Sequence, residues 1–269
     1  MNAGEMMEQF VRDRSYFHLK RMEQYKSHFQ QLLKQSFQEK EENRIVHEAY
    51  GYVAKWRKMP IYDTDHIGLN HFLHDHGLFL PLASLPLKGL PKDVEQDIAT
   101  FALPPTYSVS TNPNKKGRVV LEDIPNIVFS VEEQWSHYVR SDREHALLSN
   151  RYEKLKKNML ECQVLLTEKK IKHEFGSVSL REKKAGYDIS AILEWYGEEF
   201  LIENARVENS KLDVYMAKGL IQPKDIEPFR KVINMRADFI LMTIESESSM
   251  IKNYKQRLRY LSKAATGIA

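Results

Sequence analysis

The sequence feature that most constrains the fold is a regular apolar spacing near the middle of the chain. Ser130 and Glu133 form the S-x-x-E pattern of an N-terminal capping box, which begins a helix. After it, apolar residues recur at intervals of four and three: Leu148, Tyr152, Leu155, Met159, Cys162 and Leu166. This interval keeps apolar side chains on one helical face and is typical of a coiled-coil seam. We therefore predict a helix from residue 130 to about residue 172 that packs against another helix.

The N-terminal part of the chain is also predicted to be helical. Residues 5–43 contain neither Gly nor Pro, and their apolar residues lie three or four apart, so we expect one long helix. A second helix is expected over about 44–58, because its apolar residues again favour a helical face and Pro60 would end it.

Residues 60–128 have a different character, since they hold eight of the ten prolines. Pro91 is expected to begin a short helix toward Phe101. Residues 107–111 and 118–121 alternate in polarity around an Asn-Pro-Asn turn, which predicts a β-hairpin.

After the seam, the apolar period changes from 3.5 to 2. Residues 175–181 and 187–189 are predicted to pair as a second hairpin. Short helices are expected over 190–196 and from Ser210 to about Gly219, and a last long helix from Pro228 to about residue 262. We identify no internal repeat.

These patterns predict a mainly α chain with small β-hairpins, of the α+β class, built on long antiparallel or coiled-coil helices. We divide it into four regions: an N-terminal helical arm (1–59), a Pro- and His-rich insert with a hairpin (60–128), a coiled-coil helix with a hairpin and small helical module (129–228), and a C-terminal long helix (229–269).

Composition excludes several classes of protein. The formal net charge of +3 excludes a histone-like polycation, and the 42% apolar content argues against wholesale disorder. No apolar run reaches the roughly 20 residues that span a bilayer, and the first residues lack a signal-peptide pattern, so we expect a cytoplasmic protein without a membrane partner. The single cysteine, Cys162, excludes an internal disulfide, and burial in the seam is expected to raise its pKa and make it inert.

Two groups of residues resemble enzyme sites. His71, His74 and His76 are weak candidates for a metal site, but no His-Glu-x-x-His pattern or nearby cysteine accompanies them. Asp188 and Glu203 are placed like the carboxylates of restriction-type nucleases, but Ala205 stands where such enzymes need a lysine. We therefore predict a protein with no catalytic residue, no cofactor and no enzymatic activity.

The basic residues give the sharper hypothesis. They gather where the predicted coiled coil meets the hairpin, and the candidates for binding nucleic acid or a partner are Lys169, Lys170, Lys172, Arg181, Lys183 and Lys184. A solvated surface is the plain interpretation, whereas a rim that contacts phosphates would bind with strong salt dependence and little base preference. Lys252, Lys255, Arg257, Arg259 and Lys263 form a second candidate face.

Residues 130–228 resemble a family of phage proteins. The hairpin Gly176-Ser-Val-Ser-Leu-Arg181, the following short helix with Gly197, the run Phe200-Leu-Ile202 and the helix with Lys211 are similar to the phage host-nuclease inhibitors of the Mu-type Gam family. The chain departs from the family pattern after Arg181, where Glu182-Lys-Lys-Ala replaces a proline pair.

The resemblance implies a homodimer that encloses duplex DNA and shields its ends from exonucleases. For the chain itself we expect a homodimer or a higher homo-oligomer. Arg181 and the neighbouring lysines would contact the DNA. The expected function is that of a phage or mobile-element protein that binds DNA ends or inhibits a host nuclease or defence complex. The alternative is a module that binds a bacterial enzyme complex through protein–protein contacts without touching DNA, since helical faces and charged rims also select protein partners.

Overall fold

The computed structural model describes residues 1–38, 43–124, 128–183 and 185–265, and for residues 257–265 it describes the backbone alone. The chain forms two compact units, each assembled from two separate stretches of sequence. The first unit contains Met1–Lys55 and Pro105–Lys183, and the second contains Trp56–Pro104 and Lys184–Ala269. The chain is α+β, with small antiparallel sheets among helices, as the sequence predicts.

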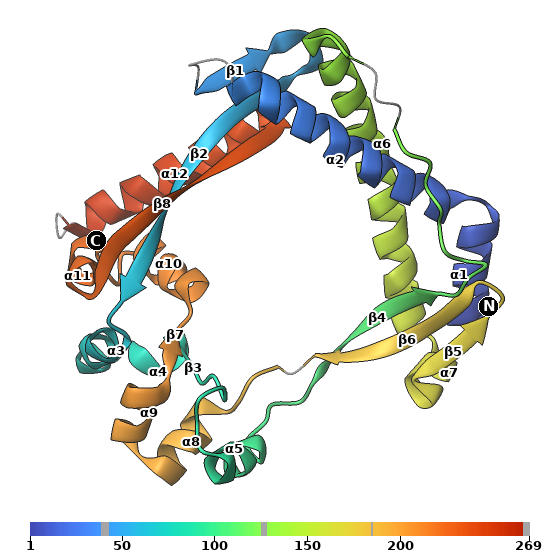
Figure 1. Ribbon diagram of the computed structural model, residues 1–269. Helices are drawn as coiled ribbons and strands as arrows, with labels where there is room; N and C mark the ends of the chain where they lie inside the picture. Colours follow the sequence, from blue (N-terminus) through green and yellow to red (C-terminus); the bar gives the residue numbers. More distant parts are fainter. Residues whose placement is uncertain (39–42, 125–127, 184, 266–269) are drawn as a thin grey trace. The chain divides into compact units, whose positions relative to one another are not determined.

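The first unit is built on an antiparallel pair of long helices, α2 (Ser15–Gln38) and α6 (Val131–Leu160), which lie side by side in Figure 1. Residues far apart in sequence meet along them: Tyr16 lies against Tyr152, Lys26 pairs with Asp142 at 2.6 Å, and Phe29 stacks on His137. The capping box is confirmed, because the Ser130 hydroxyl accepts from the backbone N–H of Glu133 and the Glu133 carboxylate accepts from that of Ser130.

Two predicted helices of this region have different bounds. Residues 5–43 are not one helix, because α1 (Ala3–Arg12) is separated from α2 by a turn in which Arg14 has a φ of 63° and the Asp13 carboxylate accepts from Ser15 N–H. The helix that begins at Val131 ends at Leu160 instead of about residue 172, and a short helix, α7 (Gln163–Glu168), follows it.

The predicted helix over 44–58 is wrong. These residues form β1 (Arg44–His47), a single 3-10 turn (Glu48–Tyr50) and the start of β2 (Tyr52–Thr64), which pair as an antiparallel hairpin. Gly51 closes the turn with a φ of 70°, a left-handed conformation that glycine adopts without steric cost.

A three-stranded antiparallel sheet completes the first unit, in the order β4 (Thr106–Pro113), β6 (Gly176–Lys183), β5 (Lys170–His173). Its buried residues Val109, Ile171 and Val178 pack into a core with side chains of α1, α6 and α7. In each predicted hairpin, one of the two segments is indeed a strand, but it pairs with a different segment from the one predicted. The strand predicted over 107–111 pairs with β6 instead of 118–121, and the strand over 175–181 pairs with β5 and β4 instead of 187–189.

The second unit is a cluster of short helices, which are α3 (His66–Asp75), α4 (Phe79–Leu82), α5 (Lys92–Ala99), α8 (Ile189–Tyr196), α9 (Glu198–Asn204), α10 (Asn209–Ala217) and α11 (Pro223–Ile226). The predicted helices after Pro91, before Gly197 and near Ser210 are confirmed. Two short strands, β3 (Ala83–Ser84) and β7 (Arg206–Val207), pair antiparallel among them. The buried amide of Asn70 donates to the carbonyls of Ile202 and Ala205 and so ties α3 to the end of α9.

The predicted helix from Pro228 to about residue 262 is correct only in its second part. Residues Arg230–Thr243 form β8, which pairs with β2, and α12 (Ile244–Ala265) follows. In the second unit, the backbone N–H of Asp65 donates to Phe229 and the ring of Trp56 lies against Phe239. Trp56 therefore lies in a strand and not in the expected helix. Within the part of the chain that the structure describes, no helix has both the length and the apolar character needed to cross a bilayer.

Candidate nucleic-acid interface

Four of the six basic residues selected from the sequence lie on one face of the sheet β4-β6-β5. Residues directly opposite one another in an antiparallel sheet point to the same side, and the side alternates along each strand. Lys170 is opposite Ser179 and Lys172 is opposite Ser177, while Arg181 and Lys183 lie two and four residues beyond Ser179 on the same strand. The four cations Lys170, Lys172, Arg181 and Lys183 therefore share one side of the sheet.

The opposite side of the sheet fixes this orientation. Val178 lies between Ile171 on β5 and Thr111 on β4, and both Val178 and Ile171 are buried in the core of the first unit. The Thr111 hydroxyl is 2.5 Å from the Tyr152 hydroxyl of α6. Because this apolar side must face the helices, the cationic side must face outward, and all four cations are exposed.

The cations lie at distances that suit a run of phosphates. Alternate residues of one strand are roughly 6.5–7 Å apart, and diagonal neighbours such as Lys170 and Arg181 are about 7–8 Å apart. Among the described residues, none of the four forms an ion pair. The one carboxylate of the three strands, Glu182, is opposite Tyr107 and belongs to the other side. The positive charge of this side is therefore not balanced by any carboxylate on the same side of the three strands.

Small polar side chains lie between the cations. Ser108, Ser110 and Asn112 of β4 are opposite Arg181, Ser179 and Ser177. The Asn112 amide donates to the Ser179 hydroxyl at 3.1 Å. Hydroxyl and amide groups can supply neutral contacts to phosphate oxygens beside the charged ones. No aromatic residue of the described strands lies on this side, so the face offers no platform for stacking bases.

The cations around the turn of the β5–β6 hairpin, in contrast, form ion pairs. Arg12 contacts Glu8 at 2.6 Å and Glu174 at 2.8 Å, and Lys116 is 3.7 Å from Glu174. Carboxylates of the chain thus compensate these cations, whereas within the described part of the chain no carboxylate pairs with the cations of the sheet face. We define the basic face as Lys170, Lys172, Arg181 and Lys183 with the intervening Ser and Asn residues.

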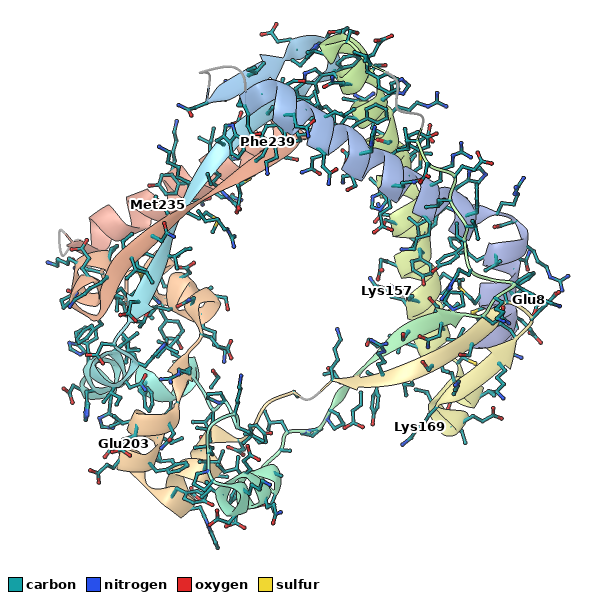
Figure 2. All side chains as sticks on the ribbon, in the orientation of Figure 1. Glu8, Lys157, Lys169, Glu203, Met235 and Phe239 are labelled. Atoms are coloured by element: carbon teal, nitrogen blue, oxygen red, sulfur yellow. The ribbon has the colours of Figure 1, made fainter. Side chains whose placement is uncertain are left out.

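The two other selected lysines have different positions. Lys169 follows α7 with a φ of 59°, and its carbonyl accepts from Leu180 N–H at 2.8 Å, so its backbone is fixed beside the basic face while its side chain is exposed (Figure 2). Lys184 lies outside the described residues. On α12, Lys252 and Lys255 line a shallow depression, and the side chains of Arg257, Arg259 and Lys263 lie outside the described part.

The three histidines considered for a metal site have separate surroundings. His74 contacts Glu198, the His76 ring nitrogen Nδ1 is 2.7 Å from the Phe72 carbonyl, and His71 is exposed on α3. Within the described residues, no group of three or more His, Cys, Asp or Glu side chains is placed to hold a metal ion.

The nuclease constellation has a structural explanation. Asp188 caps α8, where its carboxylate accepts from the N–H groups of Ser190 and Ala191. Glu203 lies in helix α9 and not on a strand beside Asp188. Asp188 and Glu203 therefore do not lie on two neighbouring strands, as the carboxylates of restriction-type nucleases do.

The expectation for Cys162 is wrong. Cys162 is the residue before α7 and is only partly buried. The backbone N–H of Leu165, followed by that of Ala3, lowers the pKa of the thiol, and this effect outweighs desolvation. The spacing placed Cys162 inside a continuous seam, but the helix ends before it.

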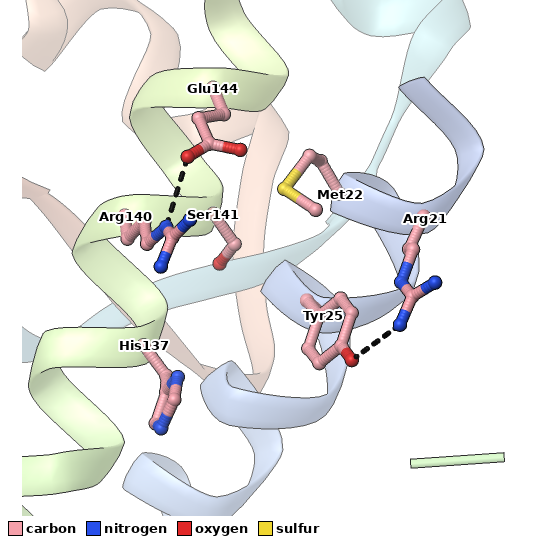
Figure 3. Close-up of a pocket in the computed structure, with 7 residues that line it drawn as sticks. All are labelled: Arg21, Met22, Tyr25, His137, Arg140, Ser141 and Glu144. Carbon is pink, nitrogen blue, oxygen red and sulfur yellow. Dashed lines mark hydrogen bonds and ion pairs between the residues drawn. The ribbon is translucent and has the colours of Figure 1, made fainter. Parts of the chain in front are cut away.

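A small cavity of about 270 Å³ lies between α2 and α6 (Figure 3). Its polar side chains already have partners: Arg21 donates to the Tyr25 hydroxyl, Arg140 to Glu144, and Ser141 to the Tyr138 carbonyl. The cavity is completed by Met22 and His137. These polar groups are thus engaged in hydrogen bonds within α2 and α6.

Comparison with protein-family models, curated proteins and solved structures finds no match for this chain. The sequence located the cations of the basic face but not the Ser and Asn residues of β4. Those residues join the face only because β4 pairs with a strand about 70 residues away, and no local signal specifies that pairing.

Proposed function

We propose that the chain is a non-enzymatic nucleic-acid-binding protein that contacts the phosphate backbone of duplex DNA through the basic face. The observation that carries this proposal is that four exposed cations on one side of a sheet have no carboxylate among them. Phosphate contacts of this kind supply affinity without reading base sequence. In keeping with the resemblance to phage host-nuclease inhibitors, we propose that binding shields DNA ends or blocks a host nuclease or defence complex.

Binding of blunt-ended duplex DNA across a range of salt concentrations tests the proposal. Each phosphate contact contributes about −0.9 to the slope of log K against log salt, so four contacts give a slope of roughly −3.6. The double variant Lys170→Gln/Arg181→Gln removes two contacts. It is expected to halve the slope and to lower affinity roughly 60-fold at 0.1 M salt, on the same relation.

A matched variant controls for net charge. Lys88→Gln/Lys92→Gln removes the same charge from two exposed lysines of the second unit and is expected to leave both the slope and the affinity nearly unchanged. Equal losses in both double variants, or no measurable duplex binding at low salt, would contradict the proposal.

A second candidate function is protein recognition, and a specific observation favours it. The second unit exposes large apolar side chains on β8 and α8: Val232, Ile233, Met235 and Trp195. Ile233 and Met235 lie two residues apart and therefore on one side of β8, and exposed apolar patches commonly mark protein-binding surfaces. A partner retained from a nuclease-treated lysate, lost in Ile233→Lys/Met235→Lys but kept in Lys170→Gln/Arg181→Gln, would support this alternative. A partner lost together with the nucleic acid would count against it.

A further inference from the structure

The elements of the chain occur twice in the same order. The first series runs from α2 through the hairpin β1–β2, the helices α3 and α4, the short strand β3 and the helix α5 to the strand β4. The second series runs from α6 through the hairpin β5–β6, the helices α8 and α9, the short strand β7 and the helix α10 to the strand β8. In the second series, α7, α11 and the 3-10 turn Glu227–Phe229 are additional elements, and only the first series has a 3-10 turn, Glu48–Tyr50, inside its hairpin. This order contradicts the expectation of a chain without an internal repeat.

The two hairpins also share a sequence pattern. Arg44-Ile-Val-His-Glu48 corresponds to Lys170-Ile-Lys-His-Glu174 at the first strand and the turn. Tyr50-Gly-Tyr-Val53 then corresponds to Phe175-Gly-Ser-Val178, with Ala49 as one extra residue in the first turn. Both turn glycines have a positive φ, and Val53 and Val178 are both fully buried. The match therefore includes the turn glycine and a buried valine. The extra residue shifts the register by one, so Val53 is opposite Val46, whereas Val178 is opposite Ile171, the counterpart of Ile45.

The last strand of each series pairs with the hairpin of the other. In the first unit, β4 of the first series pairs with β6 of the second. β8 of the second series, in turn, is the sheet neighbour of β2 of the first. The short strands β3 and β7, one from each series, pair antiparallel with each other, and so do the helices α2 and α6. Such reciprocal pairing is what two copies related by a two-fold axis produce.

We infer that the chain is an internal duplication whose two copies, residues 15–113 and 131–243, exchange their last strands. An isolated two-stranded hairpin is marginally stable, so each copy obtains from the other the third strand that its sheet needs. One chain thereby supplies the association that a two-fold dimer obtains from two chains. The inference rests on element order, strand pairing and sequence correspondence, and it does not depend on DNA binding.

Strand exchange predicts which residues can be joined by a disulfide in the full-length protein. Ser110 of β4 is opposite Ser179 of β6, and opposite Cα atoms in such pairs lie about 4.5–5.5 Å apart, within the range that a disulfide spans. If β4 instead completed the hairpin of its own copy, Ser110 would be opposite Ala54, the counterpart of Ser179. The variants Ser110→Cys/Ser179→Cys and Ser110→Cys/Ala54→Cys, each with Cys162→Ala, separate these arrangements.

After mild oxidation and digestion, mass spectrometry is expected to find the linked peptide in most chains of the Ser110/Ser179 variant and only at background in the Ser110/Ala54 variant. Asn112→Cys/Ser177→Cys is a second pair in the same register, for use if the first variant does not unfold cooperatively. Linkage of the Ser110/Ala54 pair, or of neither kind of pair in folded protein, would overturn the exchange.

A transplant tests the duplication itself. Residues 44–53 are replaced with residues 170–178, which preserves the pattern around the turn, and a control carries the same inserted residues in reverse order. The transplant is expected to unfold cooperatively and to keep the Ser110–Ser179 linkage when the two cysteines are present, whereas the control loses cooperative unfolding. A transplant that behaves like the reversed control would contradict the equivalence of the two hairpins.

Discussion

The hairpins β1–β2 and β5–β6 have the same connectivity but present different chemistry. In the second hairpin, the outward positions hold Lys170, Lys172, Arg181 and Lys183. Their sequence counterparts in the first hairpin are Arg44, Val46, Trp56 and Lys58. There the register differs by one residue, so Arg44 and Val46 lie opposite Lys55 and Val53, on the other side of the sheet from Trp56 and Lys58. The buried positions change less, because Val53 and Val178 are equivalent and equally buried. The buried valine is thus kept in both hairpins, whereas the four positions that share one side in the second hairpin are divided between the two sides in the first.

The largest expected effect tests the equivalence of the buried side. Val53→Asp and Val178→Asp each place an unpaired carboxylate in a fully buried position and are expected to cost at least about 4 kcal/mol of unfolding free energy. Chemical denaturation monitored by circular dichroism measures both. Val120→Asp, at a residue that is 79% exposed, is the control and is expected to change stability by less than about 0.5 kcal/mol. A loss of well under 4 kcal/mol at only one of the two valines would contradict the equivalence of Val53 and Val178.

The elements that the sequence predicted well are those with a strong local signal. The capping box at Ser130 and Glu133, the turn at Gly197 and the helix after Pro91 depend on neighbouring residues alone. Residues 44–58 and 230–243 were predicted as helices because their apolar residues can be read with a helical period, although Ile45, Val46 and Val53 are β-branched. Pairing with distant strands decides their conformation, and that information is not local.

In the candidate site, too, the features with a local sequence signal could be predicted, and those that depend on distant strands could not. Alternation along residues 170–172 and 177–183 is enough to place the cations on one side once the strands are known. The contribution of β4 and the existence of two equivalent hairpins could not be read in the same way, because Ala49 shifts the register of the pattern and few identities remain between the copies.

An intermediate effect is expected at Tyr52, which anchors the first hairpin to α6. Its hydroxyl donates to the Asp142 carboxylate at 2.6 Å, and its counterpart in the second hairpin is Ser177. Tyr52→Phe is expected to lower the unfolding free energy by about 1–2 kcal/mol, since Asp142 keeps its contact with Lys26. Ser177→Ala is the matched control at a position that is also buried, and it is expected to lose less than Tyr52→Phe, since no carboxylate contacts the Ser177 hydroxyl within the described residues.

The same residue gives a pH dependence with a defined sign. Burial, followed by the hydrogen bond to Asp142, raises the pKa of Tyr52 to about 12 from the ordinary value of 10.0. Because the folded pKa is the higher one, the contribution of Tyr52 is complete below pH about 10 and is lost as pH rises toward 12. The stability difference between the wild type and Tyr52→Phe should therefore shrink across that range. A difference that stays constant to pH 12 would show that the anchor does not depend on the protonated hydroxyl.

The smallest expected effect concerns Cys162, which lies between α6 and the second hairpin. Backbone N–H groups at the start of α7 lower the pKa of its thiol, and the thiolate is the nucleophile in alkylation. The midpoint of the alkylation rate against pH is therefore expected to lie below the midpoint measured for the same chain unfolded in urea. The midpoint is a better measure than the absolute rate, because partial burial slows access and a thiolate of lower pKa is intrinsically less nucleophilic. A midpoint at or above that of the unfolded chain would indicate that desolvation dominates, and would restore the buried seam position that the sequence predicted for this residue.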